Sequence, residues 1–172
     1  MSALLRLLRG PAGHPLHPPL TDAAIGAYTT AAVLAVIGAI GWIEDAAGKG
    51  GWLALVVGLV FGALAAVTGL ADLLRMDSRM PVWRTAILHM LAMVAATALF
   101  ALAAVFQYAG FAEGRVTTAG LVLTLVGFAV LTLCGWLGGT VVYVHGMRVM
   151  SEPRRPASEA VRVEQRPLRR VS

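Results

Sequence analysis

Residues 52–74 read WLALVVGLVFGALAAVTGLADLL, and Asp72 is the only charged residue in this stretch. About 20 consecutive apolar residues allow a helix to cross the ~30 Å hydrocarbon core of a bilayer. That core offers no water to the backbone, so a crossing segment must satisfy its amide groups internally, as a helix does. The stretch therefore predicts a transmembrane helix.

Three further apolar runs of this kind lie at about residues 22–43, 83–108 and 117–149. The connections between the four runs are short, and short connections make consecutive helices antiparallel neighbours. The expected fold is all-α, an integral membrane four-helix up-down bundle that occupies residues 13–149. The chain is 58% hydrophobic and 13% charged, against about 25% charged residues in soluble domains, which agrees with this fold.

Local signals predict where the first two helices begin. Thr21 and Asp22 are good N-cap types and predict the start of the first helix. The prolines of the preceding segment GHPLHPPL, residues 13–20, argue against a regular helix there. The charged and glycine-rich segment EDAAGKGG, residues 44–51, predicts a short loop before the second helix.

Lys and Arg residues are distributed unevenly along the chain. Twelve of the 14 lie before the first helix, around the middle connection or from Arg148 onward, and the other two connections hold only Lys49 and Arg115. Cytoplasmic segments of membrane proteins are rich in Lys and Arg. We therefore expect a multi-pass protein of the bacterial cytoplasmic (inner) membrane with both termini cytoplasmic.

The two flanking segments suggest contact with the membrane surface. Residues 1–12 place leucines around Arg6 and Arg9, which predicts a basic amphipathic surface segment. Residues 150–172 are rich in Pro, Arg and Glu, which predicts a polar, disordered cytoplasmic tail. The expected partners are the bilayer and, at the arginine-rich ends, anionic lipid headgroups. Assembly into a homo-oligomer or a larger membrane complex is left open.

The histidines gather on the expected cytoplasmic side of the bundle. His14 and His17 precede the first helix, His89 lies about two turns into the third, and His145 lies near the end of the fourth. Asp72 is near the same end of the second helix. His89, Asp72 and His145 each continue a face of small residues, which normally points toward other helices. We therefore expect one shared site in the cytoplasmic third.

Two pairings within this group are expected. His89 is deep enough in the membrane that its ionisable ring needs a partner, and Asp72 across the hairpin is the expected one. His14 and His17 are three residues apart, which places both imidazoles on one side of a polyproline-type segment. That spacing suits a ligand clamp.

Four segments carry a resemblance to a known family. They are GHPLHPPLTDAAIGAY at 13–28, TGLADLL at 68–74, the start of the third helix from Arg84 to His89, and GWLGGTVVYVHGMRV at 135–149. Over about residues 13–149 the chain resembles a family of bacterial membrane proteins catalogued as domain of unknown function 2231. The resemblance implies four helices with an HPxHP-type opening. Some members are fused to Rieske-type iron–sulfur domains, which implies redox work near the membrane.

The leading functional hypothesis is a small membrane redox or electron-transfer protein that binds haem b near the cytoplasmic face. Helical bundles bind cofactors through side chains that project inward, and histidine is a common axial ligand of haem iron. His89 and His145 are the expected ligand pair. His17 is the substitute if their depths do not match, and His14 is the remaining candidate.

Two alternatives use the same residues differently. In the first, a divalent transition metal is bound by His14, His17, His89 and His145 with Asp72 in support, because imidazole suits several such metals. In the second, the protein is a structural accessory subunit of a membrane complex and binds no cofactor.

Other function classes have little support in the sequence. The net charge of +5 lies mostly at the ends and one connection, without a folded basic module for nucleic acid. The single cysteine, Cys134, excludes an internal disulfide and a Cys-based zinc site. No Ser-His-Asp arrangement, phosphate-binding glycine loop or zinc-hydrolase motif is present. No catalytic residue is therefore expected, and the absence of an inverted repeat argues against a transporter.

Overall fold

The structure, a computed structural model, describes residues 10, 14–147 and 149 and consists of helices. The elements are α2 (His17–Ala39), α3 (Glu44–Leu73), α4 (Pro81–Glu113), α5 (Thr118–Gly139) and the π-helical turn η2 (Thr140–Val144). Within the described residues, four helices are long and apolar enough to cross a membrane, the last of them including η2. The four-helix membrane bundle predicted from the sequence is confirmed.

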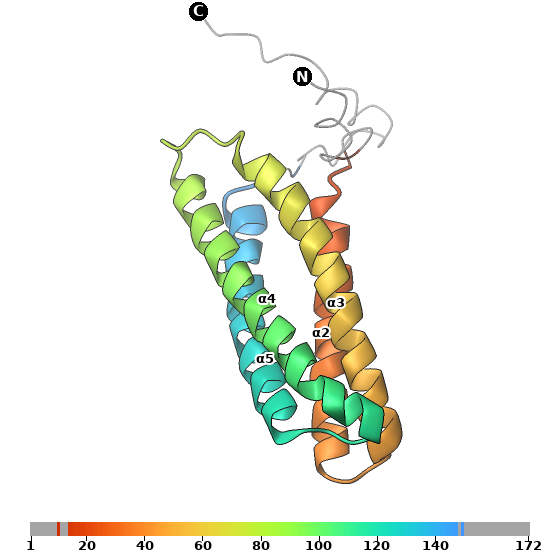
Figure 1. Ribbon diagram of the computed structural model, residues 1–172. Coiled ribbons are helices and arrows are strands. Elements are labelled where there is room, and N and C mark those ends of the chain that lie inside the picture. Colours follow the sequence, from red (N-terminus) through yellow and green to blue (C-terminus); the bar gives the residue numbers. More distant parts are fainter. Residues whose placement is uncertain (1–9, 11–13, 148, 150–172) are drawn as a thin grey trace, which may run out of the picture.

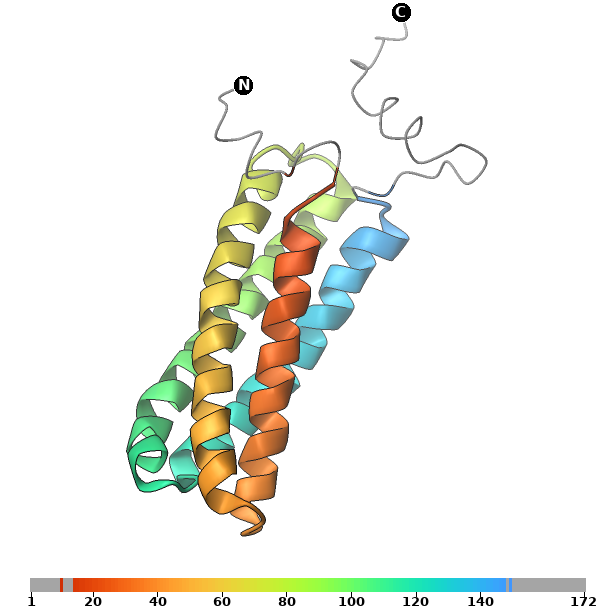
Figure 2. The same ribbon diagram turned by 90° about the vertical axis from the view of Figure 1, so that its right-hand side faces the viewer.

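The helices run up and down through the bundle (Figure 1). We call the end that holds the start of α2, the α3–α4 connection and η2 the histidine end, and the opposite end the glutamine end (Figures 1 and 2). The closest packing is within two hairpins, α2 on α3 and α4 on α5, whereas α3–α4 and α2–α5 touch less. The bundle is thus built from two paired hairpins.

An aromatic pair joins the two hairpins at the bundle centre. The rings of Tyr28 on α2 and Phe100 on α4 stack with centroids 3.8 Å apart and planes 6° from parallel. A glycine makes room for each ring, because a Cβ at Gly58 would lie 2.5 Å from Tyr28 and one at Gly127 would lie 3.1 Å from Phe100. The outward faces of the helices are apolar, with exposed large hydrophobic side chains on all four, most of them Val or Leu. Such a surface suits lipid.

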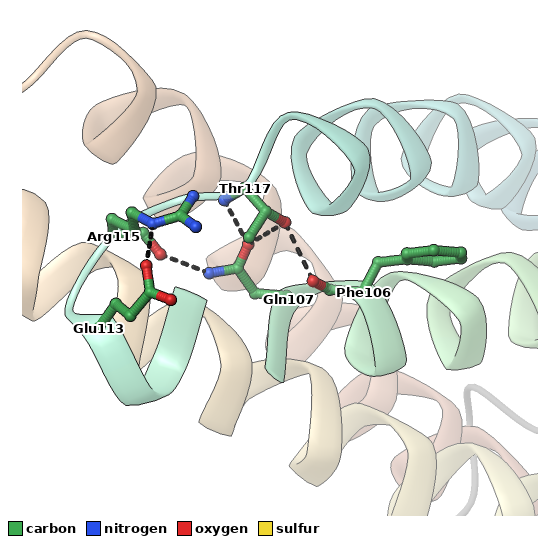
Figure 3. A network of polar contacts seen from close by, with 5 residues as sticks. All are labelled: Phe106, Gln107, Glu113, Arg115 and Thr117. Carbon is green, nitrogen blue, oxygen red and sulfur yellow. Dashed lines mark hydrogen bonds and ion pairs between the residues drawn. The ribbon is translucent and has the colours of Figure 1, made fainter. Parts of the chain in front are cut away.

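Gln107 closes the glutamine end (Figure 3). Its side chain is 5% exposed. Nε2 donates to the carbonyl of Arg115 at 2.8 Å, and Oε1 accepts from the backbone N–H of Thr117 at 2.9 Å. The α4–α5 turn itself is made by Gly114, which ends α4 at φ 68°, a left-handed conformation that glycine adopts without strain. The buried side-chain amide of Gln107 therefore bonds two residues of this turn, Arg115 and Thr117.

The predicted start of the first helix is wrong. α2 begins at His17, so Pro18 and Pro19 lie in its first turn and Asp22 is an exposed residue inside the helix. Proline is tolerated in a first turn for two reasons. The first N–H groups of a helix have no partner within it, and the φ of proline suits a helix. His17 is helical, so the polyproline geometry expected for His14 and His17 does not apply.

α3 and α4 are also longer than predicted, whereas the fourth helix, predicted over 117–149, ends with η2 at Val144 and is shorter. α3 begins at Glu44 and not Trp52, so the expected loop 44–51 is helical. Glycine is needed there for close packing, because a Cβ at Gly48 would lie 2.7 Å from the Arg115 carbonyl oxygen. α4 extends from Pro81 to Glu113, and α5 changes to a π-helical turn at Thr140. The predicted surface segment 1–12, apart from Gly10, and the tail 150–172 lie outside the described residues.

Candidate functional site

A cavity of about 600 Å³ lies at the histidine end. Most of its described wall comes from α3 and α4, with smaller parts from α2 and η2, and α3 and α4 separate toward this end in Figure 1. On α4 the lining extends from Ala86 to Ala101, which is roughly 22 Å at the ~1.5 Å rise of a helix. The cavity is therefore a long slot that reaches from the histidine end toward the middle of the bundle.

The wall of the slot is apolar except for a few side chains. The described polar lining residues are His17, Thr21, Asp72, His89 and Thr97. Small and flexible apolar residues supply most of the rest, including Met90 and Met93 on α4. A mostly apolar cavity with a few polar groups is the usual form of a small-molecule or cofactor site.

His17 reaches this slot from the first turn of α2. Its Nδ1 lies 2.8 Å from the carbonyl oxygen of Ala65 on α3, and the Thr68 hydroxyl is 3.5 Å away. The ring lies over Gly69, where a Cβ would come within 2.7 Å of Cε1. A side chain at position 69 would therefore displace the imidazole.

His89 reaches the same slot from α4. Its Nδ1 lies 3.0 Å from the carbonyl oxygen of Cys134 on α5. The ring lies over Gly138, where a Cβ would come within 3.0 Å of Cε1. The Nδ1 partner of His89 is thus a backbone carbonyl on α5, and the carboxylate of Asp72, which was expected in that role, lines the slot separately.

If each imidazole is taken in its neutral form, its hydrogen bond determines the tautomer. A carbonyl oxygen only accepts, so Nδ1 must carry the proton and donate it. The other nitrogen, Nε2, then keeps its lone pair. This is the usual state of a metal-binding histidine, whose second ring nitrogen is held by a backbone carbonyl or a carboxylate. His17 and His89 therefore each keep one nitrogen, Nε2, whose lone pair can bind a metal ion, and both rings line the same cavity.

The remaining predicted residues lie elsewhere. His145 is exposed just after η2, with Nε2 3.3 Å from the Thr85 hydroxyl, and it is not in the described lining of the slot. His14 is exposed and precedes α2, and it is also not in that lining. Of the four histidines, the structure brings only His17 and His89 to the same cavity.

The predicted metal-ligand set is dispersed in the same way. Across residues 10, 14–147 and 149, no group of three or more His, Cys, Asp and Glu side chains is placed to hold a metal ion. His14, His17, His89, His145 and Asp72 therefore do not form one cluster of ligands here. What remains is a pair of histidines, His17 and His89, on the lining of one cavity.

The sequence did not reveal that two glycines have a role at this site. Gly69 and Gly138 leave the helix surface open where each histidine binds. A helical side chain leans toward the N-terminus and covers the preceding turn. Glycine at these positions thus exposes the carbonyl four residues earlier, Ala65 or Cys134, to the imidazole. Both glycines lie in segments that carry the resemblance noted above, TGLADLL and GWLGG.

Comparison with known proteins identifies the family. The family model described as "Predicted membrane protein (DUF2231)" matches residues 13–151, which include all four helices and both histidines of the slot. Comparisons with curated proteins and with solved structures give no match. Since the family model covers most of the chain and the fold agrees with its description, the chain belongs to the DUF2231 family of membrane proteins.

Proposed function

We propose that the protein is a small redox or electron-transfer protein of the membrane, which binds haem b in the slot through His17 and His89. One observation carries this proposal. Two histidines from different hairpins line the same cavity, and a backbone carbonyl holds Nδ1 of each. That arrangement leaves Nε2 of both rings available as ligands.

The residues present fit a haem. The slot of about 600 Å³ lies in the range of small-molecule and cofactor cavities, about 300–1,000 Å³. Its lining of alanine, glycine, valine and methionine suits an apolar macrocycle, and His17 and His89 would hold the iron. When bound, the haem supplies a reversible one-electron couple. The protein supplies the ligands, fixes their tautomer and keeps the surroundings apolar.

The choice of ligands refines the sequence prediction. His89 and His145 were the expected pair, with His17 as the substitute. The imidazole of His145 bonds to Thr85 outside the described lining of the slot, whereas His17 faces the slot together with His89. His17 begins α2 and His89 lies on α4, so the two rings approach from different hairpins. Two ligands of one iron need this kind of placement.

The proposed setting is the cytoplasmic membrane, with the histidine end toward the cytoplasm. Arg75, Arg79 and Arg84 lie at the histidine end, and the α2–α3 and α4–α5 connections at the glutamine end hold Lys49 and Arg115. This asymmetry supports a cytoplasmic histidine end. Haem would then lie near the cytoplasmic face, within reach of redox partners on that side.

Absorbance spectra of detergent-purified protein test the proposal. We expect a Soret band that shifts on reduction with dithionite, and we expect His17→Ala and His89→Ala each to remove it. His145→Ala is the matched control and should keep the band. Haem retained in both the His17 and His89 variants would disprove the ligand assignment, and a colourless wild-type protein would disprove the haem.

Metal analysis of the same samples separates the two alternatives that the sequence left open. Stoichiometric transition metal in a colourless protein would favour the non-haem site, and a protein without metal would favour the accessory subunit.

A further inference from the structure

The buried residues of α2 and α4 correspond position by position. His17 and His89 are 72 positions apart, and the same offset carries each of the six buried residues of α2 onto a buried residue of α4. The pairs are Ala24 with Ala96, Tyr28 with Phe100, Ala31 with Ala103, Ala32 with Ala104, Ala35 with Gln107 and Gly38 with Gly110. The first helices of the two hairpins therefore have matching inward faces.

The second helices of the hairpins correspond in the same way. Each of the five buried residues of α5 lies 69 positions after a buried residue of α3. The pairs are Gly51 with Gly120, Leu55 with Thr124, Gly58 with Gly127, Gly62 with Leu131 and Ala65 with Cys134. The same offset relates Gly69 and Gly138, the glycines beneath the two imidazoles. The two hairpins are thus two versions of one structural unit.

The contacts between the hairpins indicate how these two units are related. Tyr28 and Phe100, which are equivalent positions, stack on each other with planes 6° from parallel. In a twofold arrangement a residue at the axis contacts its own counterpart, so this stack marks the place where the axis passes. Both hairpins begin and end at the histidine end (Figures 1 and 2). The axis therefore runs along the bundle, as it does between parallel repeats of membrane proteins.

Two residues related by such an axis lie at the same depth and on opposite sides of it. His17 and His89 are related in this way. Both line the slot, and their imidazoles are close enough to interact electrostatically. Thr21 and Met93, one turn further along each helix, are also equivalent and also line the slot. The slot therefore includes the axis at the level of the two histidines.

We propose that the chain is a tandem repeat of one helical hairpin, and that the two repeats hold one haem at the twofold axis between them, with His17 and His89 as equivalent ligands. This inference rests on the proposed function and sharpens it in two respects. It predicts one haem per chain and not one per hairpin. It also gives the two ligands the same depth, which two ligands of one iron require.

Replacement of either histidine by glycine tests whether the two ligands are equivalent. Glycine removes the ligand and leaves room for free imidazole. We expect His17→Gly and His89→Gly, supplied with haem, each to regain the wild-type Soret band on titration with imidazole. The half-saturating concentrations should agree within about threefold, which corresponds to about 0.7 kcal/mol. Rescue of one variant alone, or two haems per wild-type chain, would overturn the inference.

His145→Gly is the matched control and should show the wild-type band without imidazole. Methionine variants provide a second measurement if glycine at position 17 or 89 prevents folding. Methionine is a good helix former, and as a haem ligand it raises the reduction potential. We expect His17→Met and His89→Met each to raise the midpoint potential of the haem. A rise in one variant alone, or in neither, would overturn the equivalence of the two ligands.

Distances between spin labels test the axis without haem. Val33, Val57, Val105 and Val126 are exposed, and the axis exchanges Val33 with Val105 and Val57 with Val126. We expect Val33→Cys with Val126→Cys and Val105→Cys with Val57→Cys to give the same most probable distance by pulsed electron paramagnetic resonance. Different distances in these two label pairs would overturn the twofold axis.

The label pairs need a background without the native cysteine. Cys134→Ala supplies it, because Ala65 occupies the equivalent position of the first hairpin. Pairs within one hairpin, Val33 with Val57 and Val105 with Val126, are the control. Their distances should agree if the hairpins are alike, whether or not an axis relates them.

The failure of this inference and that of the haem proposal give different results. A haem protein whose label distances differ between the hairpins, or of whose glycine variants only one is rescued, overturns this inference alone. A colourless protein whose label distances agree overturns the haem and retains the repeat and its axis.

Discussion

The imidazoles of His17 and His89 occupy equivalent positions in the two hairpins of the bundle. Each ring comes from the first helix of its hairpin and lies over a glycine of the second, Gly69 or Gly138. Each Nδ1 donates to the carbonyl four residues before that glycine, at 2.8 Å for Ala65 and 3.0 Å for Cys134. The two hairpins thus present the same device to one cavity, which is why we assign the two histidines one joint role.

The glycines beneath the rings are the first test of this relationship. A valine at position 69 or 138 would collide with the imidazole above it, since even a Cβ would lie 2.7 or 3.0 Å from Cε1. We expect Gly69→Val and Gly138→Val each to lower the haem content of the purified protein by at least half, as measured by the Soret absorbance per protein.

Gly135→Val is the control for these variants. A Cβ at Gly135 meets nothing within 4 Å. Gly135 lies on α5, as Gly138 does, so this substitution should leave the haem content unchanged. If Gly69→Val and Gly138→Val retain full haem, the rings do not need these positions and the proposed ligand geometry is wrong.

The buried amide of Gln107 is expected to stabilise the glutamine end. Gln107→Leu removes its bonds to Arg115 and Thr117 and leaves a carbonyl and an N–H without their partner. The cost of such a loss is about 1–3 kcal/mol. At about 2–4 °C per kcal/mol for a chain of this size, thermal unfolding in detergent should shift down by roughly 2–12 °C.

The exposed ion pair at the same turn gives the comparison for Gln107. Arg115 and Glu113 are bonded at the surface, where such pairs contribute little. Glu113→Gln should therefore lower the unfolding temperature less than Gln107→Leu does. A larger loss in Glu113→Gln than in Gln107→Leu would show that the turn depends on charge and not on the buried amide.

The aromatic centre should not tolerate a side chain at Gly58. A Cβ at position 58 would lie 2.5 Å from Cε1 of Tyr28, and Phe100 stacks on the same ring. Overpacking of this kind costs about 1–3 kcal/mol. We expect Gly58→Ala to lower the unfolding temperature, whereas Gly26→Ala, with open space around its Cβ, should preserve it or raise it through better helix propensity.

The orientation of the bundle is testable with single cysteines. Cys134 is fully buried, so the native protein should react little with a membrane-impermeant maleimide. Ser78→Cys lies in the α3–α4 connection and Ala112→Cys near the end of α4, both at exposed positions. In intact cells we expect labelling of the Ala112 variant only, and in inside-out vesicles of the Ser78 variant only. The reverse pattern would contradict a cytoplasmic histidine end.

The family resemblance and the four spans were predictable because both are local properties of the chain. Apolar runs such as residues 52–74 have only one stable form in lipid, since the backbone must satisfy itself there. The helix starts were less predictable, as His17 and Glu44 show. Proline is read as a breaker, yet it fits a first turn. Glycine is read as a loop signal, yet at Gly48 it serves close helix packing.

The sequence by itself determined that the chain spans a membrane four times and that its histidines concentrate near one end. The tertiary structure decided which of them share a cavity. His17 and His89 are 72 positions apart and lie on different hairpins, so their meeting depends on how the hairpins pack. The Nδ1 bonds to Ala65 and Cys134 depend on the same packing. Hydropathy depends on each residue alone, whereas a shared cavity depends on the positions of all four helices.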